Sequence, residues 1–104
     1  MMEDELIKNI KHAIHKIEPG ADIILYGSRS RGDALLHSDW DFLILIDGIV
    51  SDKRIDKIRH SLYEIEWEYG EVISSIVRNR EDWESEFYQA IPFHQKVIEE
   101  GIRL

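Results

Sequence analysis

Apolar residues recur at helical spacing in two long stretches of the chain. Over residues 3–17 they form one stripe, which consists of Leu6, Ile7, Ile10, Ala13, Ile14 and Ile17. Pro19-Gly20 follows, so the pattern predicts an amphipathic helix that ends before this pair. A second stripe predicts a helix over residues 52–69, ended by Gly70, and it consists of Ile55, Ile58, Leu62, Ile65 and Tyr69.

Three shorter apolar runs have the length and composition of strands. They cover residues 21–26, 40–46 and 71–77. The middle run is apolar at every position after Asp41, which predicts a central strand covered on both faces. Strands and helices alternate along the chain, and this order predicts an α/β (α+β) fold in which a small mixed sheet has helices packed on it.

Three further helices complete the predicted elements. A short helix is expected over residues 28–31, and another over 80–88 with Trp83 and Phe87 on its inner face. Pro92 fits the first turn of a last helix that runs to about residue 100, with apolar positions at Phe93, Val97 and Ile98. Residues 102–104 are expected to trail off.

Composition limits the possible functions. The 104 residues suit one domain over 1–104, and 43% hydrophobic and 33% charged residues are typical of a globular protein. The net charge of −8 opposes binding to long nucleic acid. The chain has no cysteine, no apolar run of membrane-spanning length and an acidic start unlike a signal peptide. We therefore expect a cytoplasmic protein without a membrane or long nucleic-acid partner.

The residues with chemical potential lie between the first two predicted strands. Gly27-Ser28 ends the first strand at the start of a short helix, where glycine permits close approach of a ligand and backbone N–H groups favour an anion. Asp39 and Asp41 are two positions apart at the start of the second strand and so share a face. Two such carboxylates suit Mg²⁺, which prefers oxygen ligands. The pattern predicts metal-assisted chemistry on the phosphates of a nucleotide.

This motif resembles a known signature. Gly27-Ser28, ten intervening residues and Asp39-x-Asp41 resemble the DNA polymerase β-like nucleotidyltransferase superfamily. The Arg-Ser-Arg-Gly-Asp sequence after Ser28, and Ser38 before the aspartates, resemble its minimal nucleotidyltransferase (MNT) branch. Members of that branch are usually the smaller partner of a HEPN-domain protein.

The resemblance implies a fold, ligands and a partner. The fold would be that of the polymerase β-like nucleotidyltransferases, with Asp39 and Asp41 as catalytic residues that hold one or two Mg²⁺ ions. A nucleoside triphosphate, expected to be ATP, would bind to Gly27, Ser28, Arg29, Arg31 and Ser38. The chain would transfer AMP, or another nucleoside monophosphate, to an acceptor hydroxyl on a HEPN-type toxin and act as its antitoxin.

One part of the family pattern is missing. A third carboxylate is expected in the strand over 71–77, but Ser74 stands at the position where the family often has aspartate. Glu71 is three residues away and would point to the other face of a regular strand. Ser74 therefore keeps a second function open, a weakly active or inactive binding module that neutralises its partner by contact. A third is transfer to a small molecule, although the aminoglycoside nucleotidyltransferases that do this usually carry an extra helical domain.

Several other residues could have either a structural or a functional role. His12 and His15 are one helical turn apart, but a solvated helix face explains them better than a metal site that has only two ligands. We expect Trp40 to pack in the core and His37 to lie in an exposed loop. Arg29 and Arg31 could bind phosphate or pair with neighbouring acids such as Asp33.

The number of aromatic residues suggests an interaction surface. Four of them exceed what a core of this size needs, and they are Trp67, Tyr69, Trp83 and Phe87. We therefore expect some of them to face a partner, either the HEPN protein or a second copy in a homo-oligomer.

Overall fold

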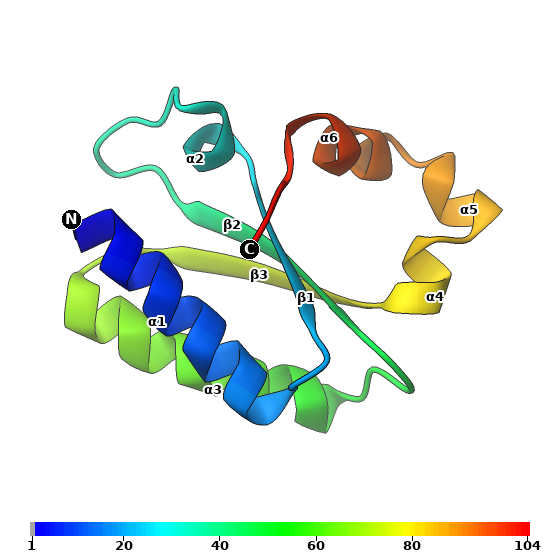
Figure 1. The fold of residues 1–104 in the computed structure, drawn as a ribbon, viewed down its shortest axis with the longest axis horizontal. Coiled ribbons are helices and arrows are strands. Elements are labelled where there is room, and N and C mark those ends of the chain that lie inside the picture. Colours follow the sequence, from blue (N-terminus) through cyan, green and yellow to red (C-terminus); the bar gives the residue numbers. More distant parts are fainter. Residues whose placement is uncertain (1) are drawn as a thin grey trace.

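The structure is a computed structural model that describes residues 2–104, and it confirms the predicted mixed sheet with helices packed on it (Figure 1). In chain order the elements are α1 (Met2–Ile17), β1 (Asp22–Tyr26), α2 (Ser28–Arg31), β2 (Trp40–Ile46), α3 (Asp52–Tyr69), β3 (Ile73–Asn79), α4 (Arg80–Trp83), α5 (Glu86–Gln89), α6 (Pro92–Glu100) and β4 (Ile102–Arg103). The strands lie in the order β3-β2-β1-β4. Strand β1 is antiparallel to both of its neighbours, and β2 is parallel to β3.

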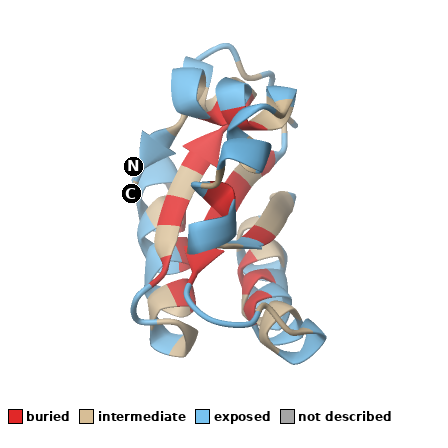
Figure 2. Ribbon diagram, turned by 90° about the vertical axis from the view of Figure 1, so that its right-hand side faces the viewer, coloured by how far each residue is buried: buried red, intermediate tan, exposed pale blue. Residues whose placement is uncertain are grey.

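Two apolar clusters hold the layers together. The larger one joins one face of the sheet to α1 and α3, which lie side by side, and it includes Leu6, Ile10, Ile14, Phe42, Ile44, Ile58 and Leu62. The smaller one joins the other face to α4 and α6, and it includes Leu43, Leu45, Trp83 and Val97. Burial is concentrated on the strands and on the inner sides of the helices (Figure 2). Strand β2 is therefore covered on both faces, as its unbroken apolar run predicts.

The segment after β3 differs from the prediction. Instead of one helix over 80–88, two single-turn helices form, and each begins with a capping side chain. Asn79 accepts a hydrogen bond from the Asp82 N–H, and Ser85 accepts one from the Tyr88 N–H. Ser85 has an extended backbone because it caps the start of α5, so the helix is interrupted between α4 and α5. Because the second helix is turned away, Phe87 is 74% exposed rather than internal, whereas Trp83 is buried as predicted.

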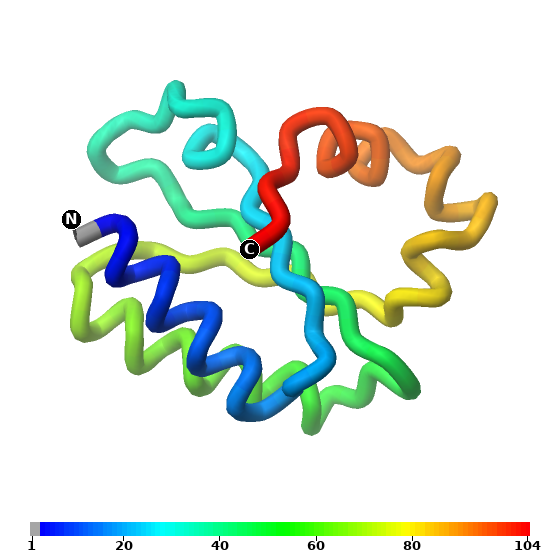
Figure 3. The backbone as a smooth tube through the Cα atoms, in the orientation of Figure 1, coloured from blue at the N-terminus to red at the C-terminus, as the bar shows by residue number. Residues whose placement is uncertain are grey.

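The C-terminal residues were expected to trail off, and this expectation was wrong. Ile102 and Arg103 form β4, which pairs with Leu25 and Ile24 of β1. The Leu104 N–H continues the contact by donating to the Ile23 carbonyl at 2.9 Å. The tube in Figure 3 shows this last segment running beside β1. A two-residue strand has no periodicity that a sequence pattern could reveal.

Helix α6 begins at Pro92 and ends at Glu100, as predicted. Ile98, which was expected to be one of its core positions, is 64% exposed. Within residues 2–104, no helix is both long and apolar enough to cross a membrane.

Candidate functional site

The first strand ends in a tight turn at Gly27. Its φ of +80° is in the region that favours glycine, and α2 begins at the next residue. The Ser30 hydroxyl donates to the Gly27 carbonyl at 2.7 Å, and the Ser30 and Arg31 N–H groups donate to the same oxygen. These bonds fix the turn. The amides at the start of a helix have no intrahelical partner, and at this turn the N–H groups of Gly27 and Ser28 are the ones predicted to meet a phosphate.

The aspartates lie beside this turn because of the register of two strands. Tyr26, the last residue of β1, is opposite Asp41 in the antiparallel ladder. A Cβ atom added to Gly27 would lie only 2.5 Å from Oδ2 of Asp41, so this carboxylate is directly against the turn. Asp39 precedes the strand and is exposed. The structure thus brings together Gly27 and Asp41, the two halves of the predicted motif.

The surroundings of Asp41 are unfavourable to its negative charge. Partial burial raises the pKa of the Asp41 carboxyl above its usual value, and the neighbouring charge of Asp39 raises it further. Glu100 acts in the same direction, while Lys96 opposes the shift. A site that concentrates carboxylates in this way is electrostatically suited to a cation.

The position of the missing carboxylate is now defined. Ser74 is the partner of Asp41 in the parallel β2–β3 ladder, and the two residues share a face of the sheet. Glu71 does not substitute for it, because its carboxylate lies 3.7 Å from the Arg29 guanidinium. Among residues 2–104, no three histidine, cysteine or acidic side chains are grouped as a metal site. Two carboxylates still fit Mg²⁺, which commonly takes its other ligands from water and substrate phosphates.

Arg29 and Ser38 are engaged with the loop that joins the turn to the aspartates. The Arg29 guanidinium donates to the Ser38 carbonyl at 3.0 Å and stacks over the Trp40 ring at 4.6 Å from its centroid. The Ser38 hydroxyl accepts from the Leu35 N–H at 2.8 Å. In this structure both residues shape the loop, and their contact with a nucleotide stays a prediction. Trp40 packs in the core as predicted.

Arg31 lies beside the turn, and it has a partner that the sequence does not reveal. Its guanidinium donates to Glu100 Oε2 at 2.6 Å, and to Asp33 at 3.1 Å. The other oxygen of Glu100 accepts from the Gly27 N–H at 3.1 Å. Glu100 lies at the end of α6, and Lys96 is one turn earlier with its Nζ 4.0 Å away. No local sequence signal could identify Glu100, because its contacts depend on the docking of α6.

The histidines show no sign of a metal site. His12 is exposed, whereas His15 shares a hydrogen bond of 2.9 Å with the Ala21 carbonyl. His37 lies in the exposed loop, as predicted.

Comparisons with known proteins identify the family and support the fold. Residues 7–104 match the family model described as a nucleotidyltransferase domain. A Methanocaldococcus jannaschii protein named "Putative protein adenylyltransferase" is 34% identical over 103 residues, which are 97% of this chain and 96% of that protein. A solved structure described as "Crystal structure of the toxin-antitoxin with AMP-PNP" has a similar fold, with a TM-score of 0.58 and 19% identity. The match covers 97% of this chain and 70% of that one.

Proposed function

Because the chain belongs to the family of nucleotidyltransferase domains, we propose that it transfers AMP from Mg²⁺-bound ATP to a hydroxyl group of a partner protein. The partner would be a HEPN-domain toxin, and this chain its antitoxin. The name of the M. jannaschii relative supports a protein acceptor and an adenylyl group. The structural neighbour is a toxin-antitoxin with AMP-PNP, which supports an adenine nucleotide and a toxin partner.

The observation that carries this proposal is the contact between the turn and Asp41. The Asp41 carboxylate lies so close to Gly27 that no side chain fits between them. A phosphate bound to the amides of the turn would therefore lie next to the carboxylates. Mg²⁺ held by Asp39 and Asp41 would be shared with the phosphates, which is how it is commonly bound in phosphoryl-transfer sites.

Each residue has a defined task in the proposed reaction. The amides of Gly27 and Ser28, with the Arg31 guanidinium, would hold the β- and γ-phosphates. The acceptor oxygen forms a bond to the α-phosphorus while the bond from that phosphorus to the bridging oxygen breaks, and pyrophosphate leaves. The metal would supply charge compensation for the leaving group. Because Ser74 leaves the neighbouring strand without a carboxylate beside Asp41, the hydroxyl proton would pass to water or to a base on the partner.

Ser74 supports a second candidate, which is neutralisation of the partner by contact. A serine at this position can neither carry the charge of a metal ligand nor act as a general base. The fold would then serve as a binding module that has lost most of its activity.

A transfer experiment separates these two functions. The chain is incubated with a HEPN-domain protein as candidate partner, with Mg²⁺ and with ATP labelled at the α-phosphate. The proposal predicts label on the HEPN protein, none with ATP labelled at the γ-phosphate, and none with Asp39→Asn/Asp41→Asn. Neutralisation of the toxin by that double variant, without label on either protein, would favour the contact mechanism.

A further inference from the structure

Glu100 occupies hydrogen-bond donors of the phosphate-binding turn. Its Oε1 accepts from the Gly27 N–H at 3.1 Å, and its Oε2 accepts from the Arg31 guanidinium at 2.6 Å. The side chain is only 12% exposed. These contacts join residues that are 73 and 69 positions apart in the sequence, so they arise from tertiary structure alone.

The fold holds the backbone of Glu100 in place. The next residue, Gly101, packs so closely that an added Cβ would collide with the Val97 carbonyl oxygen and with the Ile24 side chain. Ile102 then pairs with Leu25 in the sheet. Helix α6 is thereby fixed against β1, and its last side chain is presented to the turn that follows β1.

A carboxylate and a phosphate group require the same donors. Both are oxyanions that accept charge-assisted hydrogen bonds from N–H groups, and one amide N–H cannot serve both in full. The Gly27 amide and Arg31 are two of the groups that the proposed function assigns to the triphosphate. A phosphate could reach them only after the Glu100 carboxylate had moved away.

Lys96 offers the displaced carboxylate another partner. It lies one turn earlier on α6, with its Nζ 4.0 Å from Oε1 of Glu100. If the Glu100 side chain changed rotamer, its carboxylate could pair with the Lys96 ammonium at the surface of α6. The lysine side chain is flexible enough to follow it. The backbone of α6 would not have to move.

We propose that Glu100 is an internal competitor for the phosphate-binding turn, which the triphosphate must displace from Gly27 and Arg31. This inference rests on the proposed function, because it takes the turn as the phosphate site. Glu100 therefore weakens nucleotide binding and sets the concentration of nucleotide at which the site fills. The alternative role, in which Glu100 holds Arg31 and the turn ready for the ligand, has the opposite consequence.

Calorimetric titration with Mg-ATP distinguishes these roles in the full-length chain. We expect Glu100→Gln to bind Mg-ATP about tenfold more tightly than the wild type, the scale of one charge-assisted hydrogen bond. Glu99→Gln is the matched control, since it removes the same charge from an exposed neighbour that bonds only to Gln95 among the described residues. The control should stay within about twofold of the wild type, because an exposed charge is well screened.

Equal or weaker binding by Glu100→Gln, with measurable binding by the wild type, would overturn the inference and leave the proposed function standing. If neither the wild type nor Glu100→Gln bound Mg-ATP, the inference and the proposed function would both be overturned. The variant, whose turn is no longer occupied by a carboxylate, should bind more readily than the wild type. Glu100→Ala repeats the test with a side chain that cannot bond to Gly27. A titration of the wild type with inorganic tripolyphosphate should shift the Gly27 amide resonance, and an unchanged resonance at saturation would contradict displacement.

Discussion

Ser74 is the direct partner of Asp41 in the parallel ladder of β2 and β3, and the two side chains share a face of the sheet. A carboxylate at position 74 would therefore stand beside the aspartate pair. In its absence the site has one strand of acidic ligands instead of two. We therefore propose that Ser74 limits the activity of the domain.

Ser74→Asp should complete the metal site. We expect the three carboxylates to repel one another without metal, so the variant is less stable than the wild type in chelator. Mg²⁺ should then stabilise it more than it stabilises the wild type, by mass action. The AMP-transfer rate should rise about a hundredfold if the new group acts as a base.

Thermal unfolding with and without Mg²⁺ measures the first effect. Ser75→Asp is the control, because Ser75 is the next strand residue and lies on the opposite face. If Mg²⁺ raises the unfolding temperature of both variants equally, position 74 is not part of a metal site.

Gly27→Ala should abolish nucleotide binding. The substitution forces a side chain into a backbone with φ of +80° and places its Cβ 2.5 Å from Oδ2 of Asp41. Gly32→Ala is the control, since Gly32 also has a φ of +80° but no atom within 4 Å of the added Cβ. Gly32→Ala should lose about 1 kcal/mol of stability from strain in a left-handed backbone. Gly27→Ala should lose more, because its ψ of −163° lies in a region almost exclusive to glycine and the new Cβ meets Asp41.

Chemical unfolding and Mg-ATP titration of these two glycine variants separate the effects. The collision with Asp41 predicts that Gly27→Ala alone loses binding. Equal binding by both variants would show that the contact between turn and carboxylate is not required.

The ion pair between Glu18 and Arg54 should make stability depend on pH. Two hydrogen bonds, of 2.9 and 2.7 Å, join the Glu18 carboxylate to the guanidinium, which holds the pKa of Glu18 below its usual 4.5. A lowered pKa in the folded state means that the stabilisation is present above about pH 4.5 and is lost as the pH falls through the folded value.

Glu18→Gln should accordingly cost about 1.5 kcal/mol at pH 7 and much less at pH 3. Urea unfolding at the two pH values gives the difference. A deficit of the same size at both would mean that the charge of Glu18 contributes nothing.

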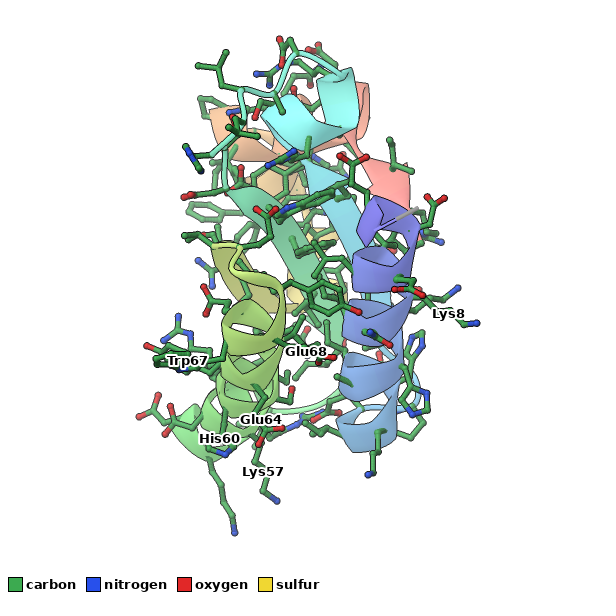
Figure 4. The ribbon with its side chains drawn as sticks, turned by 90° about the vertical axis from the view of Figure 1, so that its left-hand side faces the viewer. Lys8, Lys57, His60, Glu64, Trp67 and Glu68 are labelled. Atoms are coloured by element: carbon green, nitrogen blue, oxygen red, sulfur yellow. The ribbon has the colours of Figure 1, made fainter. Side chains whose placement is uncertain are left out.

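Trp67 should belong to an interaction surface rather than to the core. It is 87% exposed on α3, and helical spacing places it on the same side of this helix as Lys57, His60 and Glu64 (Figure 4). Trp67→Lys should change the free energy of unfolding by less than about 0.5 kcal/mol, as for ordinary surface substitutions. Trp83→Ala, by contrast, removes a buried ring and should cost about 3–5 kcal/mol.

The same Trp67 variant should weaken assembly, either with the proposed HEPN-domain partner or with a second copy of the chain. Analytical ultracentrifugation of the chain, alone and mixed with that protein, tests this. Unchanged assembly in both experiments would exclude Trp67 from the interface.

The sequence was informative where local patterns decide the structure. The stripes of α1 and α3, the apolar run of β2 and the turn at Gly27 all follow from spacing or from residue type. The prediction failed where capping side chains overrode a helical pattern, as at Ser85, and where pairing partners are distant, as for β4. The role of Glu100 could not be predicted for the same reason, because the contact depends on how α6 docks against β1.

The central claim, that the turn and the aspartates form one nucleotide site, is tested most directly by calorimetric titration of ATP in the presence of Mg²⁺. The wild type and the Asp39→Asn/Asp41→Asn variant are compared under the same conditions. The account predicts binding by the wild type that requires Mg²⁺ and is lost in the double variant. Equal binding by the two proteins, or none by the wild type at millimolar ATP, would contradict it.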